Sequence, residues 1–446
     1  MRADTGADKG ADSALRTAVS GRVLLPGDAG FAAAARPWNL AVEQPVAAVV
    51  EATDADDVAA VVRYARRTGR AVAAQTTGHG AAPGTDGAIL LRTRRLDAVE
   101  VRPELRLARV GAGVTWDRVL AAAAPYRLTG LAGSSPVVGV AGYTLSGGLS
   151  WYGRAHGWAA DAVTAFEVVD ADGGRARVTA ETDPELFWAL RGGGGDFAIV
   201  TALEFELVPA PDLYGGSMAW PLDRADEVAA AYLEITAQAP PALSAWLGRV
   251  NIPGVPPAVT VSVAFLGTAE EARDLLKPLD AIPGAVEDTR RPLDPAELGA
   301  ITGDPVDPMP SATGGELLAG LDEAALRVLL HEPIDPLAGL QLRHLGGALA
   351  EERPGRGACG TLAEPYLLYT YGAVAGPEQA AAIRERQRSL AAALGDLATG
   401  RRPYICLGAG ETVAHTFPAA TVDRLRRIKR ERDPHGVILA NHPVAH

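Results

Sequence analysis

Ala71-Val72-Ala73-Ala74-Gln75-Thr76-Thr77-Gly78-His79-Gly80 runs from an apolar segment into a turn that holds a histidine between two glycines. The apolar segment predicts a strand, and the turn adds two hydroxyl side chains. Glycine on both sides of His79 permits positive φ angles and lets a ligand approach the main chain closely. Successive backbone N–H groups in such a turn form a concavity that suits phosphate. The stretch therefore predicts a phosphate-binding turn at the end of a strand.

A strand and a helix precede this turn in the chain. An apolar strand is expected at residues 45–51, followed by a helix with Thr53 as its N-cap and Asp56 at position N3 of a capping box. Apolar residues then recur at the spacing of one helix face, and Gly69 ends the helix. Strand, helix, strand and turn predict a compact α/β unit.

Composition and charge exclude several classes of protein. The 446 residues suffice for two or three domains, and a hydrophobic share of 48% is typical of globular proteins. A net charge of −12 argues against nucleic-acid or anionic-membrane partners. The two cysteines are too few for a disulfide framework, and no metal site is expected. No leader or membrane span is predicted, so we expect a cytoplasmic protein whose residues 1–19 form a disordered tail.

Glycine, proline and small residues are concentrated between Gly133 and Gly148. This composition is incompatible with a long regular helix or strand. Such bare backbone can lie flat against a large rigid ligand and donate N–H groups to it. The alternative is a tight loop inside a packed α/β domain.

The pattern changes at about residue 208. Prolines now separate strands of alternating character, most clearly at residues 259–266 and 367–371. Helices are predicted at residues 268–277, with Thr268 and Glu271 as a capping box, at residues 377–394, and at residues 421–432. We expect a second α+β domain built on an antiparallel sheet.

Four ordered motifs resemble the berberine-bridge-enzyme-like FAD-linked oxidases of bacterial type, which belong to the vanillyl-alcohol-oxidase/PCMH flavoprotein superfamily. The motifs are Gly78-His79-Gly80, Pro136 to Tyr143 with Gly147-Gly148, Phe187 to Arg191 with the four glycines that follow, and the C-terminal pair Asp433-Pro434-His435-Gly436 and Asn441-His442-Pro443. The resemblance covers nearly the whole chain.

The resemblance implies an α+β fold with a PCMH-type FAD-binding domain and an inserted substrate domain whose antiparallel sheet is covered by helices. It places the FAD domain at residues 20–207, the substrate domain at residues 208–403, and a segment that returns to the FAD domain at residues 404–446. The implied FAD contacts are Gln75, Thr76, Thr77, Gly78, His79, Gly80, Gly133, Ser134, Ser135, Val138, Gly139, Val140, Gly142, Tyr143, Gly147, Gly148, Gly153, His156, Gly157, Ile199, Val200 and Asn441.

His79 carries the most specific of these implied roles, a covalent bond to the flavin. Outside this context, a histidine at its position would simply cap the strand. Many relatives carry a second, cysteinyl bond where this chain has Ser135, so attachment through His79 alone is expected. A glycine of the family motif is Thr77 here, and we expect its hydroxyl to contact phosphate. The Tyr-x-Asn that relatives often carry is Tyr404-Ile405-Cys406 in this chain.

The resemblance implies hydride transfer from a sugar, alcohol or secondary metabolite to the flavin. Tyr404 is the first candidate for the base and Tyr143 the second, while the alternative for both is a packed tyrosine bonded to backbone. Tyr369 and Tyr371 share a strand face and are candidates to line the substrate pocket, while Glu411 and His415 near Tyr404 are unranked.

Val138 matches the family position that gates oxygen, which predicts reoxidation by O2 with release of H2O2. Two other functions stay open: a dehydrogenase with a different acceptor, and a flavin-binding enzyme that catalyses a non-redox cyclisation or elimination. A monomer or homodimer that acts on a small molecule is expected in each case.

Overall fold

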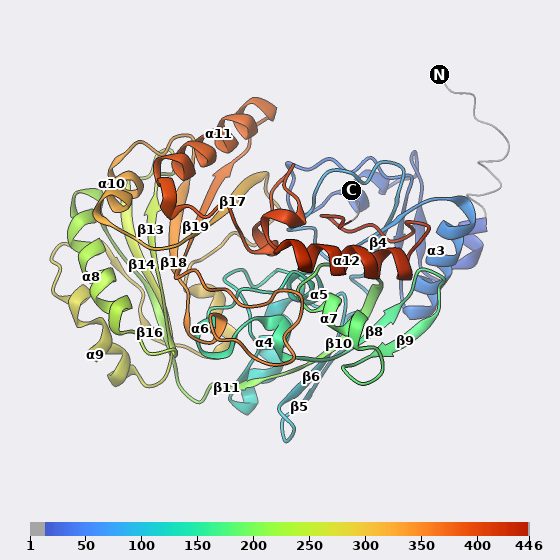
Figure 1. The fold of residues 1–446 in the computed structure, drawn as a ribbon, viewed down its shortest axis with the longest axis horizontal. Coiled ribbons are helices and arrows are strands. Elements are labelled where there is room, and N and C mark those ends of the chain that lie inside the picture. The colour runs from blue at the N-terminus through green and yellow to red at the C-terminus, as the bar shows by residue number, and fades with distance from the viewer. Residues whose placement is uncertain (1–13, 445–446) are drawn as a thin grey trace.

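In the computed structural model, residues 14–444 are described and form sheets of four, five and eight strands, together with one two-stranded ladder. The four- and five-stranded sheets lie at one end of the molecule, and the eight-stranded sheet lies at the other (Figure 1). This mixed architecture confirms the α+β fold class with an antiparallel sheet covered by helices. No helix among residues 14–444 is long and apolar enough to cross a membrane.

The histidine turn follows one strand of the four-stranded sheet. The strand order is β1-β2-β4-β3, with β2, β4 and β3 parallel and β1 antiparallel. The elements are β1 (Arg22–Leu24), β2 (Ala48–Glu51), α3 (Ala55–Thr68), β3 (Val72–Gln75) and β4 (Ile89–Arg92). β2 begins three residues later than predicted, because Val46 N–H donates to Gln44 O in a local turn. The α/β unit is confirmed.

The predicted cap of helix α3 is wrong by one residue. Asp54 is the N-cap and accepts the N–H of Asp57 at 2.9 Å. Thr53 instead donates its hydroxyl to Asp57 Oδ2 at 2.7 Å. The C-cap is Gly69 at φ 68°, as predicted.

Asp57 also corrects the expected N-terminal tail. Its buried carboxylate accepts the N–H groups of Ser20 at 2.6 Å and Gly21 at 3.0 Å. Residues 14–18 are helical, and Leu15 is buried against α3 and its sheet. The tail predicted over residues 1–19 therefore does not include residues 14–19, which are ordered by these contacts, and residues 1–13 lie outside the described part.

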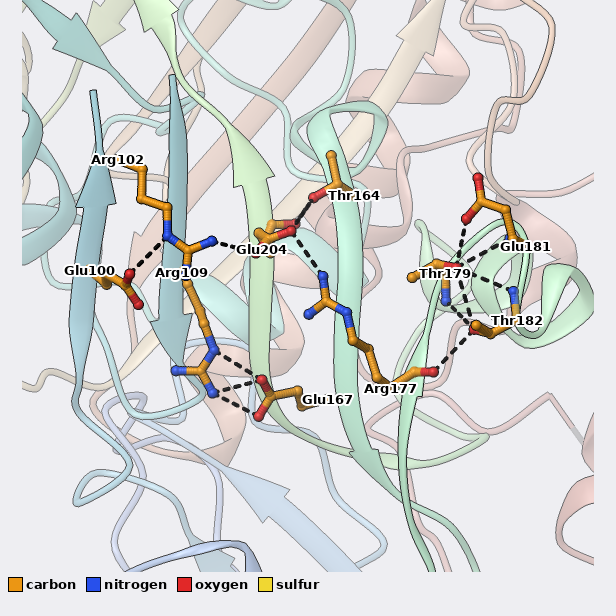
Figure 2. Close-up of polar contacts among 10 residues, drawn as sticks. All are labelled: Glu100, Arg102, Arg109, Thr164, Glu167, Arg177, Thr179, Glu181, Thr182 and Glu204. Atoms are coloured by element: carbon orange, nitrogen blue, oxygen red, sulfur yellow. Dashed lines mark hydrogen bonds and ion pairs between the residues drawn. The ribbon is translucent and has the colours of Figure 1, made fainter. Parts of the chain in front are cut away.

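The five-stranded sheet is antiparallel in the order β5-β6-β10-β8-β9. Its strands are β5 (Val99–Arg102), β6 (Leu107–Gly111), β8 (Val163–Val169), β9 (Arg175–Val178) and β10 (Ile199–Glu206), and α4 (Trp116–Ala123), α5 (Val140–Leu145) and α7 (Pro184–Leu190) accompany them. One face carries cross-strand ion pairs, including a bidentate pair of Arg109 with Glu167 at 2.7 Å and a pair of Arg177 with Glu204 at 3.0 Å (Figure 2). These charges mark a solvated face, and the apolar core lies on the other side.

The eight-stranded sheet has two chemically different faces. It comprises β12 (Leu213–Pro221), β13 (Leu243–Val250), β14 (Ala258–Leu266), β15 (Glu287–Asp288), β16 (Arg291–Pro292), β17 (Ser311–Leu318), β18 (Gly339–His344) and β19 (Tyr366–Ala373). Leucines and valines of alternate positions form a core under α8 (Ala225–Gln238), α9 (Ala269–Asp280), α10 (Glu323–His331) and α11 (Pro377–Ala393). These helices lie on the outer side of the sheet in Figure 1. The intervening positions, which include Trp246 and Tyr369, pack toward the first two sheets.

The C-terminal segment returns to the histidine turn. Helix α12 (Ala419–Arg432) is followed by residues that pair with β3, since Val72 N–H donates to Val437 O at 2.7 Å and Leu439 N–H donates to Val72 O at 3.0 Å. Buried Lys429 holds this return. Its Nζ donates to Asp433 Oδ2 at 2.8 Å, Asp196 Oδ1 at 3.1 Å, Asp196 O at 2.7 Å and Ile438 O at 2.7 Å.

Replacing Lys429 by Met tests this network. The variant leaves two buried carboxylates without their cation, so we expect unfolding to become easier by about 3–5 kcal/mol. Urea unfolding at equal FAD content measures the change. Arg430→Met on the exposed face of the same helix is the control and is expected to stay within about 0.5 kcal/mol of the parent. Equal stability of the two variants would contradict the assigned role of Lys429.

Candidate functional site

A large cavity opens where β3 ends. It encloses about 1130 Å³ of space between protein atoms, part of it open to solvent. Three parts of the chain line it, namely the histidine turn, helix α5 with the start of β10, and the C-terminal segment. The lining residues are Ala74 to Gly80, Thr93, Ala112, Ala141, Gly142, Leu145, Ser146, Gly195, Ala198 to Val200, Tyr404, Ile405, Leu407 and Leu439 to His442.

The wall formed by the turn is built from backbone donors. None of the N–H groups of Thr76 to Gly80 donates a hydrogen bond to another group within residues 14–444. Gly78 has φ 85°, and a Cβ there would lie 2.7 Å from Pro37 Cβ, so only glycine fits without strain. Five consecutive free donors beside a cavity fit an anionic ligand such as a pyrophosphate.

A buried arginine fixes the start of this turn. Arg92 Nη1 donates to Gln75 Oε1 at 2.7 Å, while its other nitrogens donate to the carbonyl oxygens of Ala34 and Arg36. Thr76 Oγ1 donates to Ala112 O at 2.6 Å, which joins the turn to the five-stranded sheet. The positions of the free N–H groups therefore depend on contacts with both sheets.

The His79 ring is held on both sides. Its Nδ1 lies 3.0 Å from Thr77 Oγ1, and Trp38 stacks on the ring with centroids 4.0 Å apart and planes 16° apart. Nε2 is buried and has no hydrogen-bond partner in the described part of the chain. Burial lowers the pKa of His79 to about 4. A neutral imidazole with one free nitrogen therefore lies in the cavity wall.

The hydroxyl of Thr77 corrects one expectation. It was predicted to contact phosphate, but it is hydrogen-bonded to the His79 ring instead. Thr77 thus positions the histidine, and the phosphate-binding capacity of the turn comes from main-chain N–H groups.

The predicted cofactor contacts fall into two groups. Those that line the cavity are Gln75, Thr76, Thr77, Gly78, His79, Gly80, Gly142, Ile199, Val200 and Asn441. Those that do not line it are Gly133, Ser134, Ser135, Val138, Gly139, Val140, Tyr143, Gly147, Gly148, Gly153, His156 and Gly157. Gly139 of this second group lies against the cavity residue Thr76, because a Cβ at Gly139 would be 2.8 Å from Thr76 Cβ.

Several glycines of the second group serve packing. A Cβ at Gly148 would lie 2.5 Å from the Tyr143 ring, and one at Gly153 would contact Leu349 beneath the eight-stranded sheet. Ser135 has a buried Oγ without a partner among the described residues, whereas Val138 packs against the core. The glycines at 148 and 153 thus have packing contacts, as the tight-loop alternative expects, and Val138 stays a predicted gate position next to Gly139.

The two tyrosines match the packing alternative. Tyr143 Oη donates to Leu131 O at 3.1 Å, and Tyr404 Oη donates to His442 O at 3.1 Å. Burial raises the pKa of both hydroxyls well above the usual value for tyrosine. Both are therefore protonated donors at neutral pH, and Tyr404 lines the cavity whereas Tyr143 does not. Glu411 and His415 are also structural, since Glu411 pairs with Arg402 and His415 caps a short helix.

Other cavity residues were missed by the motif analysis. Leu145 and Ser146 lie within the glycine-rich stretch 133–148 but were not named as contacts, and Ala198 belongs to no motif. His442 carried a signal through the C-terminal motif, but only the return of the chain to β3 brings it to the cavity. His79, Tyr404 and His442 are the titratable side chains of the wall. Burial lowers the pKa of His442, so this imidazole is also neutral.

Comparison with known proteins agrees with this geometry. A family model described as an FAD binding domain matches residues 46–179. An FAD-dependent monooxygenase, FUP4 of Fusarium proliferatum, is 38% identical over 179 residues, which are 40% of this chain and 35% of that protein. The aligned part of this chain thus spans only about a third of the length of such curated relatives.

Two solved structures share the whole fold. The 6-hydroxy-D-nicotine oxidase of Arthrobacter nicotinovorans superposes with a TM-score of 0.81 at 26% identity, covering 94% of this chain and 96% of that one. The BBE-like 1 protein of Physcomitrella patens superposes with a TM-score of 0.87 at 19% identity, covering 98% and 99% of the two chains.

The fold and the cavity thus define an FAD-binding flavoprotein. More particularly, the chain carries an FAD binding domain and has the fold of the berberine-bridge-enzyme-like proteins of the vanillyl-alcohol-oxidase/PCMH superfamily, which confirms the resemblance seen in its motifs. The free N–H groups of Thr76 to Gly80 and the unpartnered Nε2 of His79 fit FAD.

The low pKa of His79 predicts a pH effect on stability. Because the folded pKa of about 4 lies below the unfolded value of 6.5, the unfolded chain binds the proton first, and stability falls as the pH drops from about 6.5 to about 4. The loss due to His79 is at most about 3 kcal/mol. Urea unfolding of FAD-free protein at pH 7 and pH 4.5 measures it. His79→Gln is expected to lose less stability than the parent over this interval, and equal losses would contradict the assignment.

Proposed function

We propose that this protein is an FAD-linked oxidase that removes a hydride from a small alcohol, sugar or secondary metabolite. FAD supplies the hydride acceptor at the site and, with O2, the route to H2O2. The observation that carries the proposal is the histidine turn, where five free N–H groups and one unpartnered imidazole nitrogen line a single large cavity.

The proposed attachment of FAD is covalent and uses His79 alone. Burial keeps the imidazole neutral, and a neutral ring nitrogen has the lone pair that bond formation requires. Trp38 and Thr77 fix the ring, so Nε2 is the nitrogen left without a partner. Serine has no thiol, so Ser135 provides no second attachment.

The turn would hold the pyrophosphate without a positive side chain. No Asp, Glu, Lys or Arg lines the described cavity, so backbone N–H groups are the donors for an anion there. Asn441 Nδ2 donates to Gly80 O and thereby joins the C-terminal segment to the turn. The chain itself therefore binds, orients and partly encloses the cofactor.

The choice of O2 as acceptor is supported by the superposed nicotine oxidase. Val138 is partly buried against the core and precedes Gly139, which lies against the cavity residue Thr76, so its role as an oxygen gate stays part of this proposal. A dehydrogenase and a non-redox cyclase are the alternatives to be separated by experiment. Neither Tyr404 nor Tyr143 is proposed as the base, since both hydroxyls donate to backbone carbonyls.

Replacing His79 tests the covalent bond. The parent protein, precipitated with acid, is expected to keep yellow colour in the pellet and to show the mass of one bound FAD. His79→Ala is expected to release its FAD completely into the supernatant. Ser135→Ala is the control and should retain the colour as the parent does. A His79→Ala pellet that kept its FAD would overturn the assignment.

Anaerobic mixing with candidate substrates tests the reaction class. For an oxidase, absorbance near about 450 nm, a property of the flavin, should fall on mixing and recover within seconds after air is admitted, with one H2O2 formed per substrate oxidised. Slow recovery in air would favour the dehydrogenase. Conversion of a substrate without any loss of this absorbance would favour the non-redox alternative.

A further inference from the structure

The inner face of the eight-stranded sheet carries one cation without an anionic partner. Arg343 on β18 lies directly opposite Trp246 on β13. Its guanidinium carbon is 3.9 Å from the Trp246 ring centre and 4.3 Å from that of Tyr369. Arg343 forms no ion pair with any residue in the described chain. The charge is therefore balanced only by ring faces and neutral groups.

Gln341 occupies one edge of this guanidinium. Its Oε1 accepts from Arg343 Nε at 3.1 Å and from Nη2 at 2.7 Å. The Nη1–Nη2 edge has no acceptor within residues 14–444, and this edge presents two parallel N–H groups. Two parallel N–H donors match the two oxygens of a carboxylate.

The aromatic stack fixes the plane of the guanidinium. Trp151 stacks on Trp246 with centroids 3.6 Å apart and planes 13° apart, and Ser244 Oγ donates to Trp151 O at 2.5 Å. On the other side, the rings of Tyr369 and Tyr371 are 6.3 Å apart. The stack spans the junction between the FAD-binding part and the sheet, so the guanidinium needs little ordering before it binds a ligand.

The stack is next to the cofactor cavity. Tyr369 is paired with Gly315 across the sheet, and a Cβ at Gly315 would lie 2.6 Å from Cys406 Cβ. Cys406 follows Ile405, which lines the cavity. Burial raises the pKa of the Cys406 thiol to about 11, and the nearby charge of Arg343 opposes this rise. The same charge acts on Tyr143, which follows the cavity residue Gly142.

Two other buried arginines, Arg154 and Arg249, are held by the main chain. Arg154 donates to the carbonyl oxygens of Leu243, Leu345 and Ala239, and Arg249 donates to those of Leu329 and Glu332. Their guanidinium groups are bonded to main-chain carbonyl oxygens, although Arg249 Nε has no partner among the described residues. Arg343 has only one amide oxygen and a free edge, so it differs from a structural arginine.

We propose that Arg343 binds an anionic group of the substrate, namely a carboxylate, at the edge not occupied by Gln341. This inference rests on the proposed function of the adjacent cavity and names the substrate class as small organic acids. A flat ring attached to that carboxylate would extend the existing stack of aromatic side chains. The acid is held by Arg343, while the carbon to be oxidised lies toward the cofactor cavity.

Calorimetric titration of the FAD-loaded protein in chloride-free buffer tests the inference, with benzoate and its neutral isostere benzamide as probes. The parent is expected to bind benzoate about tenfold or more tightly than benzamide, the ratio typical of one charge-assisted contact. Arg343→Gln should abolish this preference while leaving benzamide binding within about threefold of the parent. Arg327→Gln on exposed α10 is the matched control and should keep the preference.

A second variant keeps the test decisive if Arg343→Gln does not fold. Gln341→Glu preserves the shape and both hydrogen bonds but supplies a carboxylate to Arg343, so benzoate should lose its advantage. Equal binding of both probes by the parent, or an unchanged preference in either variant, would overturn the inference. FAD content is measured on every sample, so that failure of the proposed cofactor chemistry is detected separately from failure at Arg343.

Discussion

The ammonium of Lys429 is the contact on which the cofactor site depends most. It joins α12 to Asp196 on one side and to Ile438 on the other, with Asp433 four residues along the same helix. The two carboxylates also accept N–H groups of Val437, Ile438 and Val444. Charges buried this deeply are tolerated only when every lone pair and proton is satisfied. Here these contacts hold the C-terminal segment against β3, and residues of this segment form the far wall of the cavity.

The same constraint explains why the site is built from main chain. The cavity wall contains backbone N–H groups and small side chains, because three segments distant in sequence must approach one another closely. The four glycines from Gly192 to Gly195 show this clearly. A Cβ at Gly194 would lie 2.4 Å from Tyr404 Oη, and one at Gly193 would lie 2.8 Å from Leu425. These glycines admit Tyr404 and α12, and thereby complete the enclosure.

Local signals in the sequence were sufficient for many elements. The capping box of Thr268 and Glu271 and the helix end at Gly69 depend on neighbours within a few residues, and the structure has both. The strands β12, β17 and β18 contain glycine or charged residues and were not predicted, because their stability comes from pairing with distant strands. Propensity carries no information about such partners.

The candidate site was predictable only where local sequence determines the backbone conformation. The histidine turn presents its free N–H groups from its own backbone, so the local sequence is enough to predict a binding turn at this position. Gly148 and Gly153 lie in a stretch that is also rich in glycine, but they face the side chains of Tyr143 and Leu349. Only tertiary contacts distinguish a glycine that faces a ligand from one that faces a side chain. The hydroxyls of Thr77 and Tyr404 are likewise hydrogen-bonded to His79 and His442. The first bond depends on the orientation of the His79 side chain, and the second depends on the return of the C-terminal segment, so neither could be predicted from the sequence.

The two halves of the site use different electrostatics. In the FAD-binding part, neutral N–H dipoles provide the positive potential, so a chain with net charge −12 needs no cationic side chain at the cavity. On the sheet, alternation places leucines and valines toward the helices and aromatic residues such as Trp246 toward the FAD-binding part, and Arg343 lies on this inner face. Successive side chains of a strand point to opposite faces of the sheet, so one face of a strand can pack in the core while the other face contacts a ligand. In the proposed function, the eight-stranded sheet selects the substrate, and the histidine turn holds the cofactor independently of it.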